Sequence, residues 1–437
     1  MPANARNTGG NLVSSCRRAL AAARRFILAC SGLYNGFPAW EVLHVSSQSS
    51  VERVRGIPLG DPRPSDVTLR DGRVVSVCSA KRQRPTVGSR TSIIAPTLFD
   101  IQVNGAFGID LQGGDVTVED VTRLNGLLAA QGVSCWIPTL ITGSPASMEH
   151  GCRVLAEAMR HKTVARAIPG IHLEGPYISP HDGPRGAHMK RHVRKPSIRE
   201  FDRLMKAADG NVCCVTVAPE VEGAIRFIKA VVRRGVVVAL GHHEASAAQI
   251  ARAVDAGARL CTHLGNGLAA MVHRHRNPLW PQLTDDRLVG SLIADLEHLP
   301  APVLKAFVRV KRPENVILTS DAVHLAGMKP GKYSLLRADV ELKPSGKICL
   351  SGTDLLAGSS LMLLQGVVNA WWATDLTLEQ AFACATRIPA SLFGVKRRWR
   401  PPVAGKKASF LVFSLDRTKS PPKASIEAVF VDGRRAA

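Results

Sequence analysis

Eight short apolar runs rich in β-branched residues recur along the chain, and most are followed by a segment with helical periodicity. Strands that alternate with helices indicate a parallel sheet, and eight such units predict a closed (β/α)8 barrel of the α/β class. A doubly wound open sheet is the alternative, but no G-x-G-x-x-G motif opens the first unit. The apolar runs span residues 91–105, 132–142, 167–175, 211–220, 236–243, 258–266, 288–298 and 315–322. The helical segments, with apolar residues at i, i+3, i+4 and i+7, include residues 118–131, 198–209, 221–235, 246–258 and 301–311.

The composition is that of a globular protein with a large core. The chain has 437 residues, 45% of them hydrophobic. No uninterrupted apolar run reaches the roughly 18 residues that span a bilayer, so no membrane partner is expected. The ten cysteines form no C-x-x-C pair, and Cys213 and Cys214 are adjacent, which suits reduced thiols better than a disulfide framework. These features predict a reducing compartment, the cytoplasm.

The net charge of +22 raises the question of nucleic-acid binding. The basic residues are dispersed over the chain, only 5% of the residues are aromatic, and no zinc-finger or RRM signature is present. Attraction for a small anion explains the charge better, and no nucleic-acid partner is expected.

The first 45 residues differ from the rest of the chain. Five arginines precede the first acidic residue, Glu41, and Ser, Ala and Asn fill the gaps between them. This composition is typical of a transit peptide, but it also fits a translated overrun upstream of the true start or a disordered basic tail. We expect segment 1–45 to lie outside the folded domains.

Polar side chains stand at the end of almost every apolar run. Because the carboxyl ends of barrel strands converge on one face, we expect these residues to meet in space. Glu174, His242 and His263 can supply the three protein ligands of a catalytic zinc site, which keeps a fourth position open. Asp321 would stay outside the coordination sphere and exchange a proton with an activated water. The strand-end residues are Asp100, Gln102, Asn104, Thr142, Glu174, Glu220, His242, His243, His263, Asn266, His298 and Asp321.

Short motifs at these strand ends resemble those of one known family. HLEGPYISP followed by GAH, then GHHEAS, THLGNG, TSDA and LAGSS, are similar to motifs of the N-acetylglucosamine-6-phosphate deacetylases of the amidohydrolase superfamily. The resemblance runs from about residue 93 to the end of the chain. It implies a distorted (β/α)8 TIM-type barrel with a small β-sandwich domain formed from the two chain ends. The implied segments are 93–395 for the metal-hydrolase barrel, and 46–92 and 396–437 for the small β domain.

The resemblance also implies roles for individual residues. Glu174, His242 and His263 match the ligands of one divalent metal ion, for which zinc is the chemical preference. Asp321 matches the catalytic acid/base, and His188 is expected to help stabilise the oxyanion. The residues that match substrate contacts are Ala187, His188, Asn266, Gly267, Arg274, His298, Leu356, Ala357 and Gly358. In relatives the arginine at the position of Arg274 comes from the neighbouring subunit, which implies a homodimer.

The end of the first strand bears on the number of metal ions. Two-metal amidohydrolases carry His-x-His there, whereas this chain has Gln102 and Asn104. An amide ligates a divalent cation weakly beside an imidazole, so the chain resembles the branch that keeps one metal. We expect one occupied site.

The resemblance implies metal-dependent hydrolysis of the acetamide of N-acetylglucosamine 6-phosphate to glucosamine 6-phosphate and acetate. A metal-activated water would attack the carbonyl, and Asp321 would accept its proton and pass it to the amine. The alternative substrate is N-acetylgalactosamine 6-phosphate or another N-acyl amino sugar. The rival class is a non-catalytic basic binding protein on the same barrel, which would have no chemical need for all four metal and proton-transfer residues.

Three positions depart from the family pattern. Thr97 and Leu296 stand where glycine is common, and Ser409 stands where an aspartate is typical. The departures leave the metal ligands intact, but they bring into question the fit of the sugar near Leu296 and the packing of the small domain.

Overall fold

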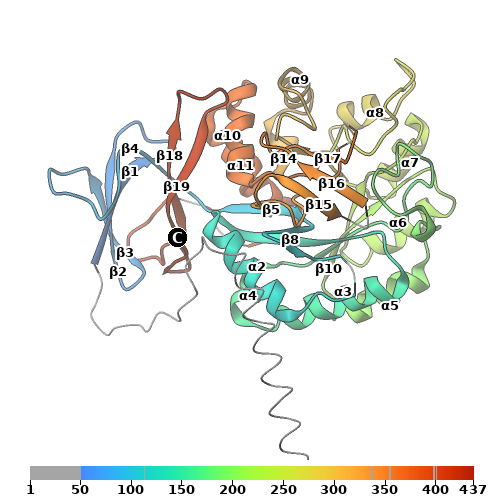
Figure 1. The fold of residues 1–437 in the computed structure, drawn as a ribbon, viewed down its shortest axis with the longest axis horizontal. Helices are drawn as coiled ribbons and strands as arrows, with labels where there is room; N and C mark the ends of the chain where they lie inside the picture. Colours follow the sequence, from blue (N-terminus) through green and yellow to red (C-terminus); the bar gives the residue numbers. More distant parts are fainter. Residues whose placement is uncertain (1–50, 113, 336–337, 354–355, 397–398, 400) are drawn as a thin grey trace, which may run out of the picture. The chain divides into compact units, whose positions relative to one another are not determined.

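The structure, a computed structural model, describes residues 51–437 apart from 113, 336–337, 354–355, 397–398 and 400 (Figure 1). The expected tail 1–45 lies outside the described residues. Residues 50–437 form one compact unit. Within the described part, no helix combines the length and the apolar character needed to cross a membrane.

An eight-stranded sheet forms the centre of this unit, and every neighbouring pair of its strands is parallel. Its order is β14-β13-β12-β11-β10-β9-β8-β5, and a parallel bridge joins Val103, the last residue of β5, to Ala322, which lies three residues beyond β14. The sheet therefore closes into a distorted barrel, and the barrel prediction is confirmed over the open sheet. Each predicted run contains one barrel strand: β5 (Leu98–Val103), β8 (Val133–Ile141), β9 (Ile171–Glu174), β10 (Val212–Val217), β11 (Val237–Leu240), β12 (Leu260–Cys261), β13 (Val289–Ile293) and β14 (Val316–Thr319).

Helices cover the outside of the barrel (Figure 1). All five helical segments predicted from periodicity are present, and their apolar faces pack into one continuous core with the strands. The helix that starts at Val118 begins with a capping box, in which the side chains of Thr117 and Asp120 each accept a hydrogen bond from the other's backbone N–H. The helices are α2 (Val118–Ala130), α3 (Pro145–Ala158), α4 (Lys162–Ala167), α5 (Ile198–Ala207), α6 (Ala224–Val232), α7 (Ala247–Asp255), α8 (Leu279–Thr284), α9 (Ala301–Lys311), α10 (Leu363–Ala373), α11 (Leu378–Cys384) and α12 (Arg387–Leu392).

Aromatic rings fill the amino end of the barrel. Phe99, near the start of β5, stacks on Trp399 with ring centroids 5.8 Å apart and an interplanar angle of 5°. Phe393 meets the same phenylalanine edge-on, at 6.2 Å. This end of the barrel is therefore packed, and the other end is available for a site.

A second sheet is built from both ends of the described chain, in the order β20-β19-β18-β4-β1-β2-β3. β4 pairs antiparallel with β18, and Arg73 of β3 bridges Lys407 just before β18, so the sheet folds over its own core. This arrangement confirms a small β domain made from the two chain ends. Its strands are β1 (Val51–Pro58), β2 (Ser65–Arg70), β3 (Arg73–Ser79), β4 (Val87–Ala95), β18 (Phe410–Asp416), β19 (Lys423–Val431) and β20 (Arg434–Arg435).

Two small antiparallel elements, which the sequence did not predict, follow barrel strands. A hairpin of β6 (Gly105–Ala106) and β7 (Ile109–Asp110) comes directly after β5. A three-stranded sheet of β15 (Gly331–Leu335), β16 (Ala338–Leu342) and β17 (Ile348–Leu350) comes after β14. Bridges from Cys349 to Leu356 and from Ser359 to Ala322 tie the segment after this sheet back to the carboxyl end of β14.

Candidate active site

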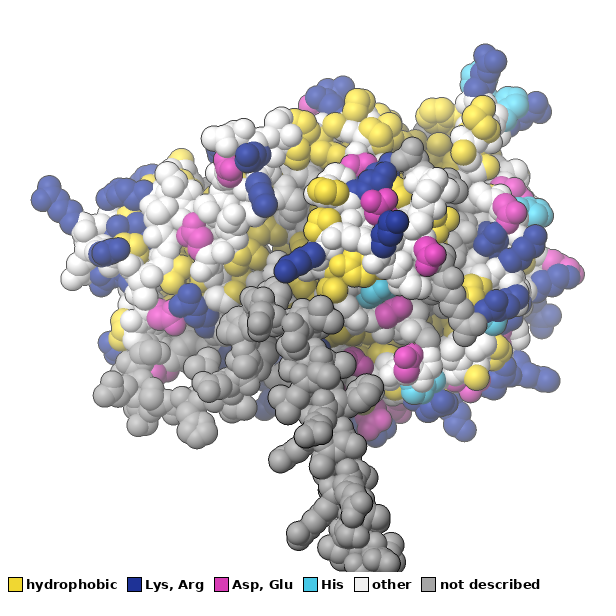
Figure 2. Space-filling view, in the orientation of Figure 1, with side chains coloured by type: hydrophobic (Ala, Val, Ile, Leu, Met, Phe, Trp, Pro, Cys, Tyr) yellow, Lys and Arg dark blue, Asp and Glu magenta, His cyan; other side chains and the backbone are white. Residues whose placement is uncertain are grey.

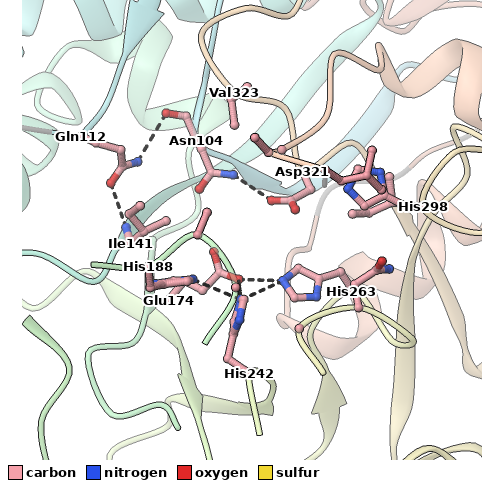
Figure 3. Close-up of a pocket in the computed structure, with 18 of the residues that line it drawn as sticks. Asn104, Gln112, Ile141, Glu174, His188, His242, His263, His298, Asp321 and Val323 are labelled. Atoms are coloured by element: carbon pink, nitrogen blue, oxygen red, sulfur yellow. Dashed lines mark hydrogen bonds and ion pairs between the residues drawn. The ribbon is translucent and has the colours of Figure 1, made fainter. Parts of the chain in front are cut away.

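A carboxylate and two imidazoles meet at the carboxyl ends of three barrel strands (Figure 3). Glu174 is the last residue of β9, while His242 and His263 each lie two residues beyond the end of their strands, β11 and β12. Glu174 Oε1 is 3.1 Å from His242 Nε2 and 2.9 Å from His263 Nε2. All three side chains are buried, and their ligand atoms lie within 4.8 Å of one another. The predicted convergence is therefore present in the structure.

The backbone at these strand ends is turned sharply to aim the side chains into the cavity. His242, His263 and Asp321 all have positive φ values, of 53°, 28° and 50°. Such values are costly for residues other than glycine, and they persist where the surrounding structure holds them. Strained backbone at three strand ends of one face is typical of a functional site.

The donor set suits a divalent cation. His242 Nδ1 lies 2.9 Å from the carbonyl oxygen of Pro184, to which only a protonated nitrogen can donate, so Nε2 turns its lone pair toward Glu174 and His263. Burial alone would lower the pKa of His263, but the hydrogen bond and charge of Glu174 raise it to about 9. Burial would raise the pKa of Glu174, yet the two histidines hold it well below its usual range. The cluster therefore stabilises positive charge at its centre, and one carboxylate with two imidazoles is a zinc-type set.

Asp321 lies on the opposite side of the same cavity, two residues beyond β14 (Figure 3). Its Oδ1 accepts hydrogen bonds from Gln102 Nε2 at 2.9 Å and from Asn104 Nδ2 at 2.7 Å. Burial, together with the charge of Glu174, raises the pKa of this carboxyl to about 7. A carboxyl with such a pKa can both accept and return a proton near neutral pH.

His188 is a neutral imidazole beside the cluster. Its Nδ1 lies 2.8 Å from Thr142 Oγ1, and its Nε2 lies 3.1 Å from His242 Nε2. Burial, and the charge of His242 next, lower the pKa of His188 to about 3. The ring therefore carries no charge at neutral pH.

His298 is held by an acidic partner that the sequence analysis did not single out. Asp295 Oδ1 accepts from the backbone N–H groups of Glu297 and His298, and Oδ2 lies 2.6 Å from His298 Nδ1. A carboxylate can only accept there, so Nδ1 carries the proton and the ring orientation is fixed.

One cavity gathers almost all of the predicted site residues. Twelve of the thirteen line it, and Arg274 does not; it lies in an exposed loop before α8. Three buried polar atoms of residues that line the cavity, Asn104 Oδ1, His263 Nδ1 and Asn266 Nδ2, have no hydrogen-bond partner in the protein. The twelve are Glu174, Ala187, His188, His242, His263, Asn266, Gly267, His298, Asp321, Leu356, Ala357 and Gly358.

Several lining residues were missed by the sequence analysis. Asp110 ends the β6–β7 hairpin, and Gln112 lies two residues beyond it. The Gln112 side chain ties this segment to the barrel, because its Nε2 donates to the carbonyl of Thr139 at 2.8 Å and its Oε1 accepts from the N–H of Ile141 at 2.8 Å. The only clue to Asp110 and Gln112 in the sequence was their position shortly after the first barrel strand. Of the strand-end residues singled out, five are not part of the cavity wall: Asp100, Gln102, Thr142, Glu220 and His243.

The three departures from the family pattern each have a structural setting. Thr97 is buried, and its hydroxyl lies 2.6 Å from that of Ser134 on β8. Ser409 accepts the backbone N–H of Asp432 at 2.9 Å, within the small domain. Leu296 adopts a φ of 68° between Asp295 and His298, so this turn keeps a glycine-like backbone with a leucine side chain.

The parallel barrel, its cation-binding cluster and the facing carboxyl define the class: a metal-dependent hydrolase with an amidohydrolase-type site. The sequence model of the Amidohydrolase family matches residues 93–436. The chain is 31% identical over 324 residues to an N-acetylgalactosamine-6-phosphate deacetylase of Escherichia coli O157:H7, covering 74% of this chain and 84% of that protein. It is 32% identical over 340 residues to the N-acetylglucosamine-6-phosphate deacetylase of Homo sapiens, covering 76% and 81%.

Solved structures agree with these relatives. The N-acetyl-D-glucosamine-6-phosphate deacetylase from Mycobacterium smegmatis superposes with a TM-score of 0.75 at 28% identity, covering 88% of this chain and 100% of that one. The chain belongs to the N-acetylglucosamine-6-phosphate deacetylase family of the amidohydrolases. It is therefore a hydrolase of carbon–nitrogen bonds.

Proposed function

We propose that this chain hydrolyses the acetamide of N-acetylglucosamine 6-phosphate to glucosamine 6-phosphate and acetate. The observation that carries the proposal is the buried cluster of Glu174, His242 and His263, whose ligand atoms lie within 4.8 Å of one another, with Asp321 across the same cavity. Relatives with this name cover most of the chain.

Glu174, His242 and His263 would hold one divalent cation, for which zinc suits a carboxylate and two imidazoles. When bound, such an ion lowers the pKa of a water and polarises a carbonyl oxygen. Gln102 and Asn104 stand where further imidazole ligands would be needed for a second ion, and both instead donate to Asp321. One ion per chain is therefore proposed.

Asp321 is proposed to move the proton. In the ionised state it takes one proton from the attacking water, whose oxygen forms the new bond to the carbonyl carbon. As the carbon–nitrogen bond breaks, Asp321 returns that proton to the nitrogen, so that the amine leaves neutral. His188, neutral and adjacent to the cluster, is placed to contact the developing oxyanion.

The rest of the cavity is proposed to bind the sugar phosphate. Asn266 Nδ2 is a buried donor without a protein partner, as expected for a group that meets a phosphate or hydroxyl oxygen. His298, oriented by Asp295, and the backbone at Gly267 and Ala187 line the same wall, and Leu356, Ala357 and Gly358 close it.

Arg274 is proposed to reach the site of a neighbouring chain in a homodimer. It does not line the cavity of its own chain, and it lies in the loop that projects before α8 (Figure 1). Met271 in this loop is 90% exposed, and Trp280 at its base is 49% exposed. Apolar side chains this exposed beside an arginine suit an arm that packs on a second copy.

Two alternatives are less well supported. The Escherichia coli relative acts, by its name, on N-acetylgalactosamine 6-phosphate, and its 31% identity is close to that of the glucosamine relatives. A non-catalytic polyanion-binding role is disfavoured because the basic side chains are scattered over the visible face with acidic ones among them (Figure 2). Cytoplasmic location is part of the proposal, since the cysteines among the described residues form no disulfide with one another.

The proposal is tested by metal analysis of the purified chain and an acetate-release assay on four sugars. We expect about one divalent ion per chain, and acetate from N-acetylglucosamine 6-phosphate but not from the unphosphorylated sugar. N-acetylgalactosamine 6-phosphate and N-acetylgalactosamine are assayed in the same way, and the comparison of the two phosphorylated sugars assigns the epimer. A metal-loaded chain that releases acetate from none of the four contradicts the proposal.

A further inference from the structure

The carboxamide of Asn104 uses only half of its hydrogen-bonding capacity within the protein. Its Nδ2 donates to Asp321 Oδ1 at 2.7 Å, whereas its Oδ1 is buried and has no partner. Because a carboxylate only accepts, the amide end of Asn104 must face Asp321 and the free oxygen must point elsewhere. Figure 3 shows Asn104 beside Asp321, facing the cavity across from Glu174.

The position of this residue is fixed by its backbone as well. The N–H of Asn104 donates to the carbonyl of Ala322 at 2.8 Å, and its own carbonyl accepts from the N–H of Leu111 at 3.1 Å. The residue is thus held between the end of β14 and the β6–β7 hairpin. A buried acceptor that cannot turn away and lacks a partner is costly unless a ligand supplies one.

Gln102 makes the same contact with Asp321 but differs in one respect. Its Nε2 donates to the same Oδ1 at 2.9 Å, yet Gln102 does not line the cavity, whereas Asn104 does. Holding Asp321 in place therefore accounts for Gln102 fully and for Asn104 only in part. The additional feature of Asn104 is a buried acceptor without a partner, on a residue that lines the cavity.

We propose that Asn104 Oδ1 accepts a hydrogen bond from the N–H of the acetamide that is cleaved, so that Asn104 selects an amide over an ester. The inference rests on the proposed function. A secondary amide is the one group of an N-acetylated sugar that offers a donor at the nitrogen to be released, and an ester offers only a lone pair there. The facing oxygens of an ester and Asn104 would repel each other.

The contact also fits the proton transfer. The nitrogen keeps its original hydrogen throughout the reaction and gains a second one from Asp321 as the carbon–nitrogen bond breaks. A single carboxamide then bridges the two groups, holding the existing hydrogen through Oδ1 and the proton donor through Nδ2. Asp321 and the nitrogen that it protonates are thereby kept adjacent.

The test compares N-acetylglucosamine 6-phosphate with its ester counterpart, 2-O-acetylglucose 6-phosphate, in the wild-type chain and in two variants. Asn104→Ala removes both the bond to Asp321 and the free oxygen, while Gln102→Ala removes only a bond to Asp321. We expect both variants to lose activity, but only Asn104→Ala to lower the amide-to-ester ratio of kcat/KM, by roughly threefold to tenfold. Asn104→Leu, which preserves the volume, replaces Asn104→Ala should the latter fail to fold.

A binding measurement separates recognition from turnover. In the chelated chain, calorimetry should show that Asn104→Ala weakens binding of the N-acetyl compound roughly threefold to tenfold and does not weaken binding of the O-acetyl compound. An unchanged ratio in Asn104→Ala, or an equal fall in Gln102→Ala, overturns the inference alone. A wild-type chain that cleaves neither compound refutes the proposed function, and the inference with it.

Discussion

His242 Nε2 lies 3.1 Å from His263 Nε2, and both face the same oxygen of Glu174. Two imidazole nitrogens and a carboxylate oxygen at such distances cannot all present lone pairs to one another without a positive charge between them. A proton or a metal ion can supply that charge. Only the metal ion also satisfies all three donors at once.

Removing the metal should destabilise the fold and stop the reaction. Dialysis against a chelator is expected to lower Tm, because a ligand at about 100 times its Kd adds about 2.7 kcal/mol to the stability. The His242→Ala variant should bind no ion, and its Tm should not change on dialysis against the chelator. His243→Ala is the matched control, since this adjacent histidine is equally buried but outside the cluster, and should keep about one ion per chain. Retention of full activity after chelation would argue against a metal site.

Asp321→Asn should remove proton transfer and leave the ion in place. An amide of the same shape cannot take up a proton from water, so kcat is expected to fall by about 10²- to 10⁴-fold. The metal content should stay at about one ion per chain, because Asp321 is not one of the three clustered donors. A variant that keeps more than a tenth of the rate would exclude Asp321 as the base.

The pH dependence of kcat/KM should show an acid limb that comes from Asp321. Burial and the charge of Glu174 raise the pKa of this carboxyl to about 7. Asp321 accepts a proton only when ionised, so the rate should be level well above its pKa and fall tenfold per pH unit below it. A bound cation favours the carboxylate and places the midpoint at or below about pH 7. Metal content is measured at each pH, and a rate that rises on acidification through this range would oppose the assignment.

Arg274 should act between subunits. Arg274→Ala is expected to raise KM by roughly tenfold to a hundredfold with little change in kcat, as for a lost charged hydrogen bond to phosphate. Mixed dimers provide the decisive measurement. When Arg274→Ala chains are co-refolded with Asp321→Asn chains, one site of each hybrid should regain an intact Asp321 together with the partner's arginine. Low-KM activity should then reappear, and its failure to do so would place Arg274 in its own site or in none.

The aromatic packing at the amino end of the barrel should contribute stability and not catalysis. Trp399→Ala removes a ring stacked 5.8 Å from that of Phe99, and should lower the unfolding free energy by about 1 to 3 kcal/mol. Trp372→Ala is the control, since that side chain is 42% exposed, and should cost less than about 1 kcal/mol. Urea unfolding measures both, and a large loss of kcat at unchanged stability would contradict the assignment.

The barrel could be predicted from the sequence because its strands and helices follow a periodic pattern of apolar residues. Each of the eight apolar runs contains one barrel strand, and Glu174, His242, His263 and Asp321 could be placed together because strand ends of a barrel share one face. The hairpin that brings Asp110 and Gln112, and the β15–β17 sheet, carry no such period. They are short elements whose place is decided by contacts with the cavity rim.

The hydrogen-bond partners of the reactive side chains could not be predicted from the sequence either. That Asn104 and Gln102 both donate to one oxygen of Asp321 depends on β5 and β14 lying side by side across a separation of more than two hundred positions. The local segment around Asp295 and His298 offered a nearer clue, an acid three residues before a histidine, but many such pairs never meet. Whether such an acid and histidine meet depends on the orientation of their side chains, which the sequence pattern does not give.

The pairing of β4 with β18 has a consequence for synthesis on the ribosome. The strands β1 to β4 of the small sheet emerge before the barrel strands, yet their partners β18 to β20 follow the barrel in the chain. The opening strands must therefore wait, with one edge unpaired, until almost the entire barrel has been made. A release of the nascent chain before Phe410 would leave that edge open, and such a fragment should be a target for chaperones and proteases.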